Sequence, residues 1–127
     1  MKLTVLLPHR VLLEQTVDRV QAKGEDGFFG LLEHHADFVS VLAPGILTYA
    51  GAGGEAHAAL DAGVLVKNGP EVLVSARDGV TDRPLGELRR AVEEQFARRE
   101  EAEERAQQAL AKMEAGFVRR LVELSHT

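Results

Sequence analysis

Two neighbouring histidines and an aspartate form the cluster in this sequence that most resembles a metal-binding group. His34, His35 and Asp37 lie close together, and Phe38 follows them. Adjacent side chains of an extended strand point to opposite faces, so the two imidazoles cannot reach one ion. The cluster also lacks the ligand spacing on a helix that zinc enzymes use. We therefore expect no metal here and interpret these residues as structural or interface residues.

Two other pairs of residues could take part in acid–base or nucleophilic chemistry. Glu25 and Asp26 are paired carboxylates, but carboxylates in turns are usually solvated or bonded to backbone N–H groups. Ser125 and His126 lie in a terminal segment that we expect to fray. The sequence therefore predicts no catalytic residue, and we expect that the protein is not an enzyme.

Three evenly spaced glycines, Gly24, Gly27 and Gly30, precede short apolar runs rather than a helix. Their spacing matches neither the dinucleotide fingerprint nor the phosphate-binding P-loop. Glycine accepts backbone conformations that suit tight turns, and this explains the pattern without a ligand. We expect no cofactor.

Four arginines occur in two pairs in the C-terminal part of the chain, Arg89 with Arg90 and Arg119 with Arg120. Arginines on a helix are usually solvated and paired with glutamates one turn away, and Glu93 and Glu94 follow the first pair at that distance. The alternative is contact with an anion or an acidic partner.

Composition excludes several classes of protein. The chain of 127 residues has a net charge of -5 and no cysteine, which argues against nucleic-acid binding, disulfides and thiolate chemistry. No apolar run approaches the roughly 20 residues that span a bilayer. Pro8 and Arg10 come too early for a signal peptide, so we expect a soluble, cytoplasmic protein.

A change of composition at Pro84 divides the chain. All prolines lie at or before this residue, whereas Glu87 to Ala115 contains no glycine, proline or other turn-forming residue. We therefore expect a β-sandwich domain over residues 1–83 and a helical domain over residues 84–127.

Short runs rich in aromatic and β-branched residues alternate with turn signals in the first part. They predict a sandwich or flattened barrel of about seven to ten short strands. The expected runs are Leu3–Leu7, Val11–Leu13, Val17–Val20, Phe28–Leu32, Phe38–Leu42, Ile46–Tyr49, Glu55–Leu60, Gly63–Lys67 and Glu71–Ser75.

Two apolar stripes at helical spacing predict amphipathic helices in the second part. The stripes consist of Leu85, Leu88, Val92 and Phe96, and of Leu110, Met113, Phe117, Leu121 and Leu124. The absence of turn residues between them favours one helix of roughly 40 residues over a helical hairpin, but both remain open. Thr81 or Asp82 is the expected N-terminal cap.

The segment from Gly24 to Leu47 resembles the signature of the epsilon subunit of F-type ATP synthases. Its matching parts are Gly24-Glu25-Asp26-Gly27, Phe29-Gly30-Leu31-Leu32, His35-Ala36 and Leu42-x-Pro44-Gly45-Ile46-Leu47. The similarity extends from Met1 to about Ala76, and the helical tail has the place and approximate length that the family leads us to expect.

This resemblance implies a non-catalytic rotor subunit in the central stalk, on the cytoplasmic side of the membrane. The sandwich would contact the gamma subunit and the ring of c subunits, with Phe28, Phe29 and residues 34–38 as candidate contacts. The helices of many members can fold against the sandwich, or extend toward the beta subunits and oppose ATP hydrolysis. The membrane would be reached only through the complex.

The sequence also departs from the common family pattern. His35-Ala36-Asp37-Phe38 and Arg119-Arg120 look more like epsilon subunits of the alternative, sodium-linked operons. The family's ATP-binding motif is degraded between Leu85 and Ala91, so we expect no tight ATP site. Two rival functions are a β-sandwich adaptor with a coiled-coil arm and a small hydrolase using Glu25, Asp26 and the histidines.

Overall fold

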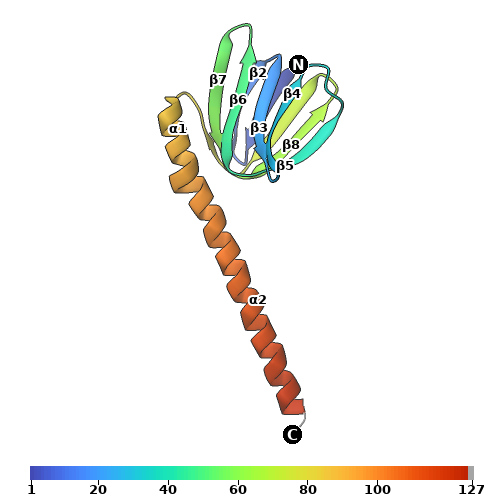
Figure 1. Ribbon diagram of the computed structural model, residues 1–127, viewed down its shortest axis with the longest axis vertical. Coiled ribbons are helices and arrows are strands. Elements are labelled where there is room, and N and C mark those ends of the chain that lie inside the picture. Colours follow the sequence, from blue (N-terminus) through green and yellow to red (C-terminus); the bar gives the residue numbers. More distant parts are fainter. Residues whose placement is uncertain (126–127) are drawn as a thin grey trace. The chain divides into compact units, whose positions relative to one another are not determined.

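The computed structural model describes residues 1–125, except for the side chains of Phe117, Val118 and residues 121–125. These residues form ten strands, two α-helices and a π-helical segment, η1, between the helices (Figure 1). The elements are β1 (Lys2–Leu7), β2 (Arg10–Thr16), β3 (Arg19–Gly24), β4 (Gly27–Leu32), β5 (Phe38–Leu42), β6 (Gly45–Gly51), β7 (Gly54–Leu60), β8 (Gly63–Asn68), β9 (Glu71–Ala76), β10 (Gly79–Val80), α1 (Leu85–Ala91), η1 (Val92–Phe96) and α2 (Ala97–Ser125).

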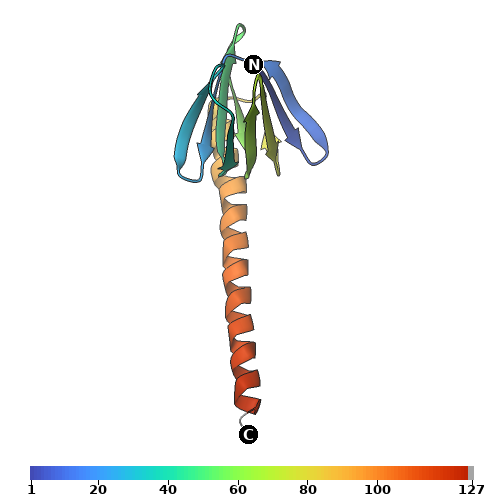
Figure 2. The ribbon, with the colours of Figure 1, turned by 90° about the vertical axis from the view of Figure 1, so that its right-hand side faces the viewer.

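The strands form one hydrogen-bonded sheet that folds onto itself as a sandwich, as the sequence predicted. The order is β10-β7-β6-β3-β5-β8-β9-β1-β2, with β4 paired to β3. Only one residue pair, Gly24 with Leu42, joins β3 to β5, and the sheet passes there from one layer to the other. Figure 2 shows the two layers separately. All pairings are antiparallel except that of β1 with β9.

Alternate residues of the strands fill the space between the layers. In β3 and β9 every second residue is buried, as expected for strands with one face in the core. Gly63 belongs to this tight packing, because a Cβ atom there would lie 2.0 Å from the carbonyl oxygen of Ser75. The largest buried core residues include Leu3, Leu31, Leu47 and Leu65.

An ion pair between a buried carboxylate and a partly exposed guanidinium ties the β7–β8 connection to the β9–β10 connection. The side chain of Asp61 has no exposed surface and accepts hydrogen bonds from Arg77 Nη2 at 3.0 Å and from the amide of Ala62 at 2.7 Å. The amide of Asp61 donates to the carbonyl of Asp78 at 2.9 Å. These contacts join the two connections where the chain passes between the β7–β10 pair and the β8–β9 pair.

A second apolar cluster holds α1 and η1 against the outer face of β6 and β7. Leu88 and Phe96 are buried with Ala59, and Ile46 and Val80 pack beside them. The predicted stripe is therefore the face by which these helical segments contact the sheet. The same packing extends the first compact unit of the chain to Ala97, and a second unit begins at Arg98.

The expected cap of the first helix was wrong. Pro84 is the N-cap residue, and its carbonyl accepts the amide protons of Glu87 and Leu88 at 2.9 and 3.1 Å. The hydroxyl of Thr81 instead faces the carbonyl of His57 at 3.5 Å. Asp82 lies before the helix with a positive φ of 61°, and no side chain makes a capping hydrogen bond to the first turn.

Of the two alternatives for the C-terminal part, the structure has the form without a hairpin. Helical residues follow one another from Leu85 to Ser125, and α2 contains 29 residues, about 43 Å at the helical rise. Leu110 and Met113 of the second predicted stripe are exposed, whereas the side chains of Phe117, Leu121 and Leu124 lie outside the described part. Among the described helices, none is long and apolar enough to cross a membrane.

We predict that Asp61→Ala lowers the free energy of unfolding by about 1–3 kcal/mol, because it removes the buried carboxylate that binds the amide of Ala62 and the guanidinium of Arg77. Urea unfolding followed by circular dichroism measures the change. Arg105→Ala, which removes an exposed ion pair with Glu101 on α2, is the matched control and should hardly move the midpoint. Equal midpoints for the two variants would contradict the role assigned to Asp61.

Candidate protein-interaction surface

The connection between β4 and β5 carries the histidines and the aspartate that the sequence singled out. His34, His35 and Asp37 are all exposed. The amide of His35 donates to the carbonyl of Leu32 at 3.0 Å, and the His35 ring lies 5.7 Å from the ring of Phe38, edge to face. The two imidazoles share no ligand geometry, and the described residues contain no group of His, Cys, Asp and Glu that could hold a metal.

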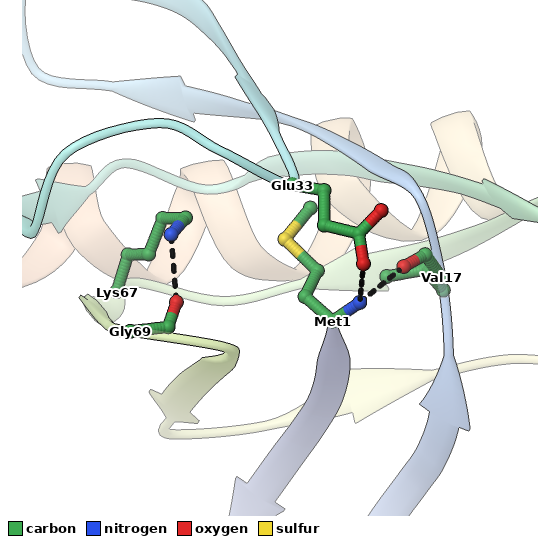
Figure 3. A network of polar contacts seen from close by, with 5 residues as sticks. All are labelled: Met1, Val17, Glu33, Lys67 and Gly69. Atoms are coloured by element: carbon green, nitrogen blue, oxygen red, sulfur yellow. Dashed lines mark hydrogen bonds and ion pairs between the residues drawn. The ribbon is translucent and has the colours of Figure 1, made fainter.

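Asp37 ties this connection to the β8–β9 turn. Its Oδ1 accepts the amide proton of Gly69 at 2.8 Å. Lys67, which is almost fully buried, donates from Nζ to the carbonyl of the same glycine at 2.7 Å (Figure 3). Both backbone groups of Gly69 are therefore bound, and the turn holds the end of the connection that precedes β5.

Glu33 ties the other end of the connection to the start of β1. Its Oε1 lies 3.5 Å from the amino group of Met1, which also donates to the carbonyl of Val17 at 2.9 Å (Figure 3). The connection is therefore held at both ends and presents His34 and His35 between them. A held loop can present side chains to a partner at little entropic cost.

The three predicted phenylalanine contacts have different environments. Phe29 and Phe38 are half-buried, pack against the core, and place their ring centroids 5.1 Å apart. Phe28 points to the outer face of the sheet and is 68% exposed. Phe29 and Phe38 therefore serve packing, whereas Phe28 offers apolar surface to the outside.

Sequence reasoning missed an apolar surface on the outer face of β5, β8 and β9. Val39, Val41, Val64 and Leu73 are exposed there, and we call these four residues the valine face. Neighbouring strands pair Val41 with Val64, so these two side chains lie across from one another. The sequence did contain a sign of this surface. β5 and β8 have apolar residues on both faces of the strand, and not only on the face that points into the core.

A groove of about 410 Å³ lies beside α1 and η1 on the outer face of β3 and β6, and Arg89, Lys23 and Phe28 line it. On its floor Thr48 Oγ1 lies 2.9 Å from His57 Nδ1, and His57 Nε2 lies 3.6 Å from Glu55 Oε1. Arg19 then pairs with Glu55 at 2.9 Å. Thr48 and His57 are cross-strand neighbours. We therefore interpret these polar contacts as supporting the pairing of β6 with β7.

The arginine pairs are exposed on their helices. No ion pair joins Arg89 or Arg90 to Glu93 or Glu94 within the described residues, contrary to the expected spacing. The arginines lie in α1, whereas the two glutamates lie in η1. Arg119 and Arg120 are exposed on α2. Ser125 and His126, the remaining candidate pair, lie outside the described side chains.

The family described as "ATP synthase, Delta/Epsilon chain, beta-sandwich domain" matches residues 1–82. An ATP synthase epsilon chain of Anaeromyxobacter is 35% identical over 72% of this chain and 71% of its own length. ATP synthase epsilon chain 2 of Paraburkholderia xenovorans is 30% identical over 96% of this chain and 90% of its own length.

Solved structures show the same fold. A chain in the cryo-EM structure of the Euglena gracilis mitochondrial ATP synthase (OSCP, F1 and c-ring) superposes with a TM-score of 0.60 at 27% identity. The superposition covers 72% of this chain and 61% of that one. A chain of the Tetrahymena thermophila central stalk and c-ring has a TM-score of 0.53 at 16% identity, a likeness of fold alone.

We predict that Asp37→Ala speeds amide hydrogen exchange at Gly69 and lowers the free energy of unfolding by about 1 kcal/mol, because the amide loses its acceptor. Exchange measured residue by residue by NMR tests this. Asp26→Ala removes an exposed carboxylate that binds no other described residue, and it should leave Gly69 unchanged. Unaltered exchange in Asp37→Ala would show that the contact does not hold the turn.

Proposed function

The chain belongs to the family of ATP synthase epsilon chains, and we propose that it turns as a non-catalytic part of the central stalk of an F-type ATP synthase. In this proposal the subunit links ATP turnover to ion movement mechanically, through its contacts with other rotor subunits. It contributes no reacting group. The complex holds it at the cytoplasmic side of the membrane.

The valine face is the observation that carries this proposal. Four large apolar side chains lie uncovered on one layer of the sandwich, whereas α1 and η1 cover part of the outer face of the other layer. Clustered exposed apolar residues mark surfaces that bind other proteins. We propose that the valine face contacts the gamma subunit, the partner that the resemblance to epsilon subunits implies.

A second contact, with the ring of c subunits, is proposed at the β3–β4 turn. Phe28 extends from the start of β4, beside the exposed turn carboxylates Glu25 and Asp26. An apolar ring beside solvated carboxylates suits the polar end of a membrane subunit, where apolar and charged groups also meet. His34, His35, Asp37 and the half-buried Phe29 and Phe38 are proposed to support these contacts as the frame of the surface.

Inhibition of ATP hydrolysis is proposed for α2. Its exposed Leu110 and Met113 form an apolar strip among charged residues, and Arg119 and Arg120 follow on the same helix. An isolated helix with an exposed strip of this kind gains stability by contact with a partner. We propose that the beta subunits are that partner, with Arg89, Arg90 and the second arginine pair contacting acidic groups.

We predict that Val39→Lys and Val41→Lys each weaken binding to purified gamma subunit at least about tenfold, since a buried ammonium group loses its hydration. Calorimetric titration measures the affinity. Val11→Lys, at an exposed valine on β2 and outside the valine face, is the matched control and should bind normally. If the unaltered chain does not bind gamma at all, the proposal fails and the adaptor function is favoured.

We predict that removal of residues 98–127 raises ATP hydrolysis by a reconstituted complex and leaves assembly intact. The cut follows Ala97 because Leu88 and Phe96 belong to the first compact unit and would be lost by a cut at Pro84. Hydrolysis rates of complexes with full and shortened chains, matched for content by gel, provide the comparison. Equal rates would remove the inhibitory role of α2 without affecting the proposed stalk contacts.

A further inference from the structure

The outer edge of β4 has no strand beside it. Within the described residues β4 pairs with β3 alone, and Figure 2 shows it as the outermost strand of the β3–β4 hairpin. Natural proteins usually protect such edges with charged residues, proline or a bulge. β4 has the sequence GFFGLL, with none of these, and Phe28 and Leu32 are 68% and 66% exposed. The edge is therefore open to pairing with another strand.

The hairpin geometry identifies the backbone groups that are available. A two-residue turn makes Gly24 and Gly27 a hydrogen-bonded pair, and bonded and non-bonded pairs then alternate along the hairpin. The backbone groups of Phe28, Gly30 and Leu32 therefore point away from β3. The carbonyl of Leu32 already accepts the amide of His35 at 3.0 Å. The three amides and the carbonyls of Phe28 and Gly30 remain for a partner strand.

We propose that β4 pairs with β4 of a second copy of this chain, antiparallel and with the two-fold axis at Gly30. In this register each Phe28 lies opposite Leu32 of the second copy, and the two Gly30 residues face each other. The paired positions are those whose backbone groups point outward. Aromatic and aliphatic side chains form favourable cross-strand pairs, and the absence of a side chain at Gly30 leaves room between the two pairs.

The polar side chains at the ends of β4 suit pairing with a second copy. The acidic turn residues Glu25 and Asp26 precede β4, and His34 and His35 follow it. Two-fold antiparallel pairing brings the carboxylates of each copy toward the imidazoles of the other. A parallel arrangement would instead bring like groups together. An imidazole N–H can donate a hydrogen bond to a carboxylate, so both ends of the strand favour the same antiparallel register.

This pairing would compete with assembly. Phe28 belongs both to the β4 edge and to the surface proposed to contact the c ring, so one copy cannot use it for both. Two free copies would protect each other's apolar edge until each joins a complex. The pairing itself does not depend on the proposed function, because it is tested on the isolated chain.

Sedimentation equilibrium of the full chain from about 1 µM to about 1 mM tests the pairing, over the range of weak to moderate dissociation constants. We expect the mass to rise from 13.8 kDa toward twice that value with concentration. Phe28→Lys should stay at 13.8 kDa, because it places a charge on the edge. Met113→Lys on α2 and Leu73→Lys on the valine face are matched controls and should still dimerise. A monomeric unaltered chain, or loss of the dimer in a control but not in Phe28→Lys, would overturn the proposal.

Cross-linking tests the register. The chain has no cysteine, and a Cβ atom at Gly30 would meet nothing closer than the carbonyl of Val20 at 3.9 Å, so Gly30→Cys should fold normally. Opposed residues of a bonded antiparallel pair lie about 5.5 Å apart at Cα, within the range of a disulfide. We expect mild oxidation to link two chains of Gly30→Cys and not of Gly53→Cys, whose site is an open turn. Equal yields from the two variants would refute the two-fold axis at Gly30.

Discussion

Backbone pairing of β3 is the constraint on which the rest of the sandwich depends. β3 pairs with β4 along its whole length, with β6 at its first three residues and with β5 at its last residue. The sheet passes from one layer to the other at that last residue. β4 pairs with β3 alone among the described residues, so it lies at an edge of the sheet.

Local signals predicted much of the fold. Asn68-Gly69-Pro70 and the glycines around residues 51–54 mark the turns that the structure has, and the stripe containing Leu88 and Phe96 marks the face of α1 and η1 that packs on the sheet. Ten strands agree with the expected number, and the family is the one that the sequence resembles. These features depend on neighbouring residues, so they can be recognised in the sequence.

Features that depend on distant residues could not be predicted. Val39 and Phe38 are both apolar, and only the pairing of β5 with β8 determines that Val39 points outward. The partner of Asp61 is sixteen residues away, at Arg77. Asp37 was singled out for chemistry or subunit contact, yet it accepts a hydrogen bond from the amide of Gly69, thirty-two residues later. The spacing of residues along the sequence does not show which distant residues the fold brings into contact.

The small cluster of Ala59, Leu88 and Phe96 has a mechanical consequence. A pull on the chain beyond Ala97 reaches Phe96 first, because the covalent backbone leads there. Few side chains resist at this point, whereas the sandwich core contains many strands bonded side by side. Peeling of η1 and α1 therefore requires less force than opening of the sandwich. We therefore expect the helical segments to detach from the sheet under load before the sandwich, with its proposed rotor contacts, unfolds.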